Sequence, residues 1–145
     1  MAMSLLINLT SISSLRRMAL GALIILEINH KEDFGLYSES LEQAKKLIKV
    51  LRELETTLDE YDYVALLEEP WDKIIIEIAE KWCINRGNKE EIKKHIKKMI
   101  KYLEKLVKGE KLTPYEKREL RKLLFLLVDI PLAEEHKLLS TLRRW

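Results

Sequence analysis

Few side chains in this sequence could act as nucleophiles, proton carriers or metal ligands, and they do not converge on a recognisable site. The histidines His30, His95 and His136 are far apart, and the single cysteine, Cys83, follows Trp82 in an apolar segment. Catalysis by a nucleophile or a metal needs several such groups held together. The sequence has no HExxH motif, no phosphate-binding glycine-rich loop and no nucleophile elbow. We therefore expect no catalytic residue and no cofactor, and we do not expect an enzyme.

Two acidic clusters contain the oxygen ligands that divalent cations prefer. One consists of Glu68, Glu69 and Asp72, at the start of a predicted helix, and the other follows His30 in a predicted loop. Neither has an acidic or histidine partner elsewhere at the spacing of a metal site. We interpret both as charged surface and expect no metal. The single cysteine excludes a disulfide within the chain, and we interpret Cys83 as a packed residue.

The charged side chains are distributed unevenly along the chain of 145 residues, although the formal net charge is only +2. Residues 1–87 carry 10 basic and 15 acidic side chains, a net charge of −5. Residues 88–145 carry 16 basic and 9 acidic side chains, a net charge of +7. This asymmetry indicates two surfaces of opposite sign, each able to attract an oppositely charged partner.

Residues 53–72, here called the acidic run, contain no lysine or arginine. One interpretation is a solvated face that lies against the basic half of the same chain. The functional interpretation is a surface that docks in the basic groove of a partner protein, including a groove that normally holds nucleic acid. The tyrosines of the run are of the type that anchors protein interfaces. The predicted contact residues are Glu53, Glu55, Asp59, Glu60, Asp62, Glu68, Glu69, Asp72, Tyr61 and Tyr63.

A stripe of lysines follows in the basic half, where five of them recur every four residues along one predicted helix. Such a stripe can lie along a phosphate backbone. It is also typical of the solvated face of an amphipathic helix, or of a surface that docks a protein. No recognition-helix motif indicates sequence-specific reading of DNA. The alternative candidate site, with a second basic patch included, consists of Lys89, Lys93, Lys97, Lys101, Lys105, Lys117, Arg118, Arg121 and Lys122.

Apolar residues recur every three or four positions through most of the chain, which is the period of an amphipathic helix. Residues 29–37 are expected to form a loop, and no strand-like alternation is present. The pattern predicts an all-α fold, a single-domain helical bundle of five or six helices over residues 1–145. The expected helices cover about 15–28, 41–58, 70–84, 90–108, 114–130 and 132–145.

Cap and turn residues mark the expected helix boundaries. The segments Ser40–Gln43, Asn88–Glu91 and Thr113–Glu116 have the capping-box pattern of a helix start. Gly87 is expected to close the helix over 70–84, and Gly109 to stop the helix that follows.

The most apolar stretch, Met18–Leu26, has nine residues, far fewer than the roughly 20 needed to span a bilayer. No signal-peptide cleavage site follows it. We expect an intracellular protein with no membrane segment. The high content of lysine, glutamate, isoleucine and leucine is typical of heat-adapted proteins, which indicates a thermophilic source or a virus that infects one.

Taken as a whole, the chain resembles the small helical proteins of archaeal viruses, a group that includes the RNA-polymerase inhibitor of a two-tailed virus and a related virion coat protein. Its length, its lysine, isoleucine, leucine and glutamate bias, its helical content and its lack of catalytic groups carry the resemblance. The resemblance implies binding within the DNA channel of host RNA polymerase, inhibition of transcription and a location in the host cytoplasm. It assigns no role to an individual residue.

Residues 90–130 also look like the helical domain of archaeal GINS replication subunits. A basic amphipathic helix, then Gly109, then Leu112–Lys117 carry this second resemblance. It implies a replication-complex subunit, although the small β-domain of those subunits has no counterpart in this sequence.

Together these observations lead to one hypothesis and two alternatives. The hypothesis is a non-enzymatic helical interaction protein that inhibits a nucleic-acid machine, such as RNA polymerase, by placing the acidic run in its basic channel. The first alternative is direct binding of nucleic acid through the lysine-striped helix. The second is a virion structural protein that self-associates through its apolar helices.

Overall fold

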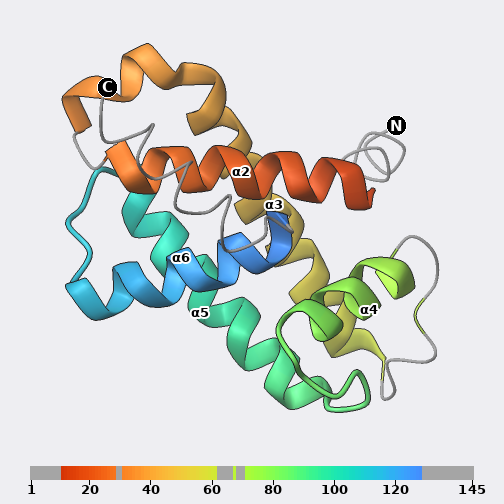
Figure 1. Ribbon diagram of the computed structural model, residues 1–145. Coiled ribbons are helices and arrows are strands. Elements are labelled where there is room, and N and C mark those ends of the chain that lie inside the picture. The colour runs from red at the N-terminus through yellow and green to blue at the C-terminus, as the bar shows by residue number, and fades with distance from the viewer. Residues whose placement is uncertain (1–10, 29–30, 62–66, 68–70, 129–145) are drawn as a thin grey trace.

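The computed structural model describes residues 11–28, 31–61, 67 and 71–128 (Figure 1). Several predicted features lie outside these residues: the last helix over 132–145, the histidines His30 and His136, and the candidate contact residues Asp62, Tyr63, Glu68 and Glu69.

Five α-helices and one 3-10 helix make up the described residues, and no strand occurs among them. The all-α prediction is therefore confirmed. In chain order the elements are α2 (Ile12–Ile28), η1 (Lys31–Tyr37), α3 (Ser38–Glu60), α4 (Trp71–Lys81), α5 (Lys89–Val107) and α6 (Pro114–Val128).

Four of these helices form the body of the bundle. Helix α2 packs against α3, α3 against α5, α5 against α6, and α6 returns to α2 (Figure 1). Helix α4 lies to one side and contacts α2 and α6. The position of α2 follows from its sequence, because Leu15, Leu23 and Ile25 lie on different sides of the helix and are all buried. The core is built mainly from leucine and isoleucine side chains.

The crossing of α2 and α3 depends on Gly21. A Cβ at this position would lie 2.5 Å from the Cβ of Gln43 and 2.9 Å from the carbonyl oxygen of Ser40. Both distances are shorter than van der Waals contact, so only glycine allows the two helices to approach this closely.

The start of α3 differs from the sequence prediction. Residues 31–37, expected to form a loop, are the 3-10 helix η1, and α3 begins directly after it at Ser38. Tyr37 is the N-cap residue and makes no capping hydrogen bond through its side chain. The expected capping box at Ser40–Gln43 therefore lies inside the helix. A 3-10 turn that leads directly into an α-helix can take the place of a cap residue at the helix start.

The end of α4 also differs from the prediction. The helix ends at Lys81, and Cys83, not Gly87, adopts the left-handed backbone with φ of 57°. The Cys83 amide donates to the Glu80 carbonyl at 3.2 Å, and the Ile84 amide donates to the Ala79 carbonyl at 2.8 Å. These two bonds define a Schellman motif. Cys83 is consequently exposed, and our interpretation of it as a packed residue was wrong.

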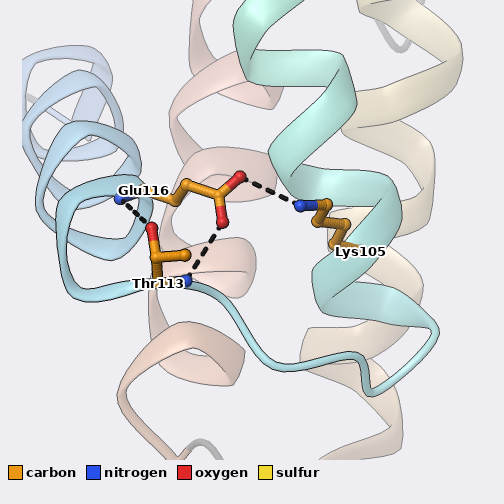
Figure 2. Close-up of polar contacts among 3 residues, drawn as sticks. All are labelled: Lys105, Thr113 and Glu116. Carbon is orange, nitrogen blue, oxygen red and sulfur yellow. Dashed lines mark hydrogen bonds and ion pairs between the residues drawn. The ribbon is translucent and has the colours of Figure 1, made fainter.

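The two ends of α5 and the start of α6 agree with the prediction. The Asn88 side chain accepts a hydrogen bond from the Glu91 amide at 3.2 Å. Gly109 has a positive φ of 76° after α5. At the start of α6, the Glu116 amide donates to Thr113 Oγ1 at 3.1 Å and the Thr113 amide donates to Glu116 Oε1 at 3.0 Å, a complete capping box (Figure 2).

Candidate functional site

The end of α3, which carries part of the acidic run, contacts the start of the basic helix α5. Lys93 forms an ion pair with Asp59, and the ammonium of Lys89 donates to the carbonyl of Tyr61. About two turns before Asp59 on α3, Arg52 pairs at 2.5 Å with Glu104, which lies about three turns after Lys93 on α5. These contacts show that α3 and α5 are antiparallel. The acidic charge at the end of α3 is therefore partly neutralised by the basic charge at the start of α5.

The ion pair between Lys93 and Asp59 stabilises the charged form of both side chains. The hydrogen bond from Lys93 lowers the pKa of Asp59, and the same bond raises the pKa of Lys93. Other lysines of α5, among them Lys97, lower the pKa of Asp59 further through their charge. Asp59 therefore acts as a counter-ion for the basic helix.

The other described residues of the acidic run do not form one continuous surface. Glu53 and Glu60 are exposed on α3, whereas Glu55 is half-buried and its Oε2 atom has no hydrogen-bond partner among the described residues. Tyr61 is partly buried against the core. Asp72 lies on another helix, α4, where its Oδ1 accepts from the Lys73 amide at 2.7 Å.

The lysine stripe of α5 winds around the helix and does not stay on one side of it. A step of four residues advances about 40° beyond a full turn, so four steps carry the stripe through about 160°. Lys93 accordingly reaches α3, while Lys105 reaches α6 and pairs with Glu116 at 3.0 Å. Between them, Lys97 and Lys101 are exposed to solvent.

A broader lysine surface remains on the outer side of α5. We call it the α5 lysine face. Its members do not form an ion pair with any described residue, and four of them are exposed while Lys98 is half-buried. Glu90 and Glu91 are the acidic side chains at the start of the helix, and Glu104 is occupied by Arg52. The α5 lysine face consists of Lys94, Lys97, Lys98, Lys101 and Lys108.

The predicted basic residues of α6 have separate environments. Arg121 contacts α2. Its Nε donates to Glu27 Oε1 at 2.5 Å, and its Nη2 donates to Glu27 Oε2 at 3.2 Å. The Glu27 side chain is only 3% exposed, so this bidentate pair belongs to the helix packing. Lys117 is half-buried, and Arg118 and Lys122 are exposed.

Arg118 and Lys122 line an open pocket on α6 together with Tyr115 and Glu119. The Tyr115 hydroxyl donates to Glu119 Oε1 at 2.9 Å, and this bond raises the pKa of Tyr115. Glu116, next to Tyr115 in the sequence, pairs with Lys105 of α5. Burial, with the nearby charges of Glu116 and Glu119, raises the pKa of Tyr102 on α5. Sequence reasoning included Arg118 and Lys122 but missed Tyr115.

The candidate chemical groups described in the structure do not gather in one place. His95 is half-buried; its Nδ1 lies 2.9 Å from the Glu91 carbonyl oxygen, and its ring lies 5.8 Å from the ring of Trp82. Within residues 11–28, 31–61, 67 and 71–128, no group of three or more histidine, cysteine, aspartate or glutamate side chains is placed to hold a metal ion. None of the described helices is both long enough and apolar enough to cross a bilayer.

The comparisons with known proteins add no relative to this description. Neither a protein-family model, nor a curated protein, nor a solved structure matches this chain. The two resemblances drawn from the sequence therefore stay predictions.

Proposed function

We propose that this protein is a non-enzymatic interaction protein that binds the phosphate backbone of nucleic acid through the α5 lysine face. One observation carries the proposal: five lysines share the outer side of one helix, and no carboxylate among the described residues pairs with them. Arg52, Lys93 and Arg121, by contrast, have acidic partners. Other exposed basic residues without an ion pair among the described residues, such as Arg17 and Lys49, lie on different helices. The α5 lysine face is therefore a concentrated positive surface of the kind that attracts a polyanion.

The chemistry of the α5 lysine face favours contact with phosphates over the reading of bases. A lysine ammonium is a compact point charge, whereas bidentate recognition of guanine is typical of arginine. Phosphate contacts fix the position of a protein on nucleic acid without sequence information. We therefore expect binding that depends little on sequence and strongly on salt.

A charge reversal tests the proposal directly. We expect Lys97→Glu with Lys101→Glu to weaken binding to a fluorescent oligonucleotide by about tenfold or more, because two phosphate contacts become repulsive. The matched control is Arg17→Glu with Lys49→Glu, which changes the net charge equally at exposed positions on α2 and α3. Equal loss of affinity in both double variants would show that net charge alone matters and would contradict the proposal.

The second candidate function is the one implied by the resemblance to archaeal-virus proteins, the inhibition of RNA polymerase through the acidic run. Glu53 and Glu60 support it, because they are exposed and lie seven residues apart, on the same side of α3. Charge reversal of both to lysine should then abolish capture of a polymerase from thermophile lysate without loss of helicity. Undiminished capture would contradict this function, and sizing chromatography of the wild-type chain would test self-association.

A further inference from the structure

Tyr115 presents its ring to solvent beside two cations. The residue is 56% exposed, which is unusual for a large side chain in a bundle whose other large apolar residues are mostly buried. Arg118 and Lys122 lie one and two turns further along α6 and line the same open pocket. The hydroxyl of Tyr115 donates to Glu119 Oε1 at 2.9 Å, one turn further along the same helix.

An exposed aromatic ring beside basic side chains is the arrangement on which proteins stack the bases of single strands. Each base has a flat π-face that can lie on a tyrosine ring, while neighbouring cations hold the phosphates on either side. Burial in the bundle does not require the ring, since Tyr115 is missing from the core cluster to which Leu120 and Leu124 of the same helix belong. The ring is therefore available for a ligand.

The pocket is lined by α6 residues alone, and an ion pair joins α6 to α5 beside it. Lys105 of α5 pairs with Glu116, the residue next to Tyr115 (Figure 2). Tyr102 follows Lys101 directly and lies four residues after Lys98. Burial, and then the charges of Glu116 and Glu119 on α6, raise its pKa. A strand that follows the lysines of α5 toward Tyr115 passes Glu116, which is paired with Lys105. The charge of Glu119 remains in the pocket, where the two cations Arg118 and Lys122 outnumber it.

We propose that the nucleic acid bound by this protein is single-stranded, with its phosphates on the α5 lysine face and one base stacked on Tyr115 beside Arg118 and Lys122. This inference rests on the proposed function. A duplex keeps its bases stacked on one another, so it could contact the lysines but could not offer a base to Tyr115 without the cost of unpairing.

The test is fluorescence anisotropy with a thymine oligonucleotide, an abasic oligonucleotide of equal length and a blunt-ended duplex without a loop. We expect Tyr115→Ala to weaken binding of the thymine strand by about tenfold, the effect typical of one lost stacking contact, and to leave binding of the abasic strand and the duplex unchanged. Tyr115→Phe retains the ring and should bind the thymine strand within about twofold of wild type. Leu36→Ala, at a residue that is 82% exposed on η1, is the control and should have no effect.

The outcomes separate the two proposals. If the thymine strand binds and Tyr115→Ala leaves that affinity unchanged, the stacking inference is wrong while the proposed function stands. An equal loss for the abasic strand or the duplex would also overturn the inference, because the tyrosine would then act through charge or folding. Absence of binding to all three probes would overturn the proposed function itself. Circular dichroism of Tyr115→Ala confirms that α6 is intact.

Discussion

Lys105 Nζ lies 3.0 Å from Glu116 Oε2, and this contact joins the last turn of α5 to the first turn of α6 (Figure 2). The other carboxylate oxygen, Oε1, accepts from the Thr113 amide at 3.0 Å. One side chain therefore caps its own helix and joins it to α5. The same contact takes Lys105 out of the α5 lysine face and sets the position of the Tyr115 pocket beside that face.

The first prediction concerns the acid stability that Glu116 confers. The hydrogen bond from the Thr113 backbone, followed by that from Lys105, lowers the pKa of Glu116 below its ordinary value of 4.5. A carboxyl with a lowered folded-state pKa stabilises the fold above its unfolded-state pKa, and this contribution is lost as the pH falls through the folded-state pKa. Glu116→Gln should therefore lower the free energy of unfolding at pH 7, and the deficit should shrink below about pH 4. Urea unfolding at several pH values measures it, and a deficit that does not change with pH would disprove this role.

The second prediction concerns Cys83. A residue other than glycine pays about 1 kcal/mol or more for the left-handed backbone that Cys83 adopts. Cys83→Gly should raise the free energy of unfolding by about 1 kcal/mol in urea titrations. Gly87 has no positive φ in the structure. Gly87→Ala is therefore a control at a glycine without the left-handed backbone, and it should not show the loss of about 1 kcal/mol that a non-glycine residue causes at a left-handed position. A destabilised Cys83→Gly protein would mean that the side chain of Cys83 matters more than its backbone.

The third prediction concerns the pair between Arg121 and Glu27. Removal of the arginine leaves a carboxylate that is 3% exposed without its partner, and such changes cost about 3 to 5 kcal/mol. Arg121→Met should thus lower the free energy of unfolding by about 3 kcal/mol. Arg118→Met, on the exposed side of the same helix, should change it by less than about 0.5 kcal/mol. Similar thermal denaturation of the two variants would contradict the assignment of Arg121 to the packing.

The fourth prediction compares two glycines. Gly21→Ala places a methyl group against Gln43 and the Ser40 carbonyl at the crossing of α2 and α3, which should destabilise the protein by about 1 to 3 kcal/mol. Gly35→Ala meets no atom within 4 Å and should be neutral or slightly stabilising. Equal unfolding midpoints for the two variants would show that the helices separate readily at this crossing.

Local signals in the sequence were sufficient for the helices and for most of their ends. The caps at Asn88 and Thr113 and the stop at Gly109 were predicted correctly, because each depends on residues within about four positions. The end of α4 was missed because a cysteine gives no indication of a left-handed backbone, whereas the later Gly87 is the residue type that usually ends a helix.

The environment of the charged side chains could not be predicted from spacing alone. Whether Lys93, Lys97 or Lys105 faces a neighbour depends on which helices flank α5, and that is decided by packing between distant segments. Arg121 looked like a member of a basic patch, yet its partner Glu27 is 94 residues away. Periodicity finds a charged face, but the fold decides which of its charges are neutralised.

The most direct test of the proposed function is the salt dependence of nucleic-acid binding by the wild-type protein. Five phosphate contacts should give a slope of log K against log salt concentration of about −3.5 for a single strand, since each contact contributes about −0.7. The double variant Lys97→Glu, Lys101→Glu loses two phosphate contacts, so its slope should be shallower by at least about 1.4. A wild-type slope near zero, or no binding at low salt, would contradict the assignment of the α5 lysine face to a phosphate backbone.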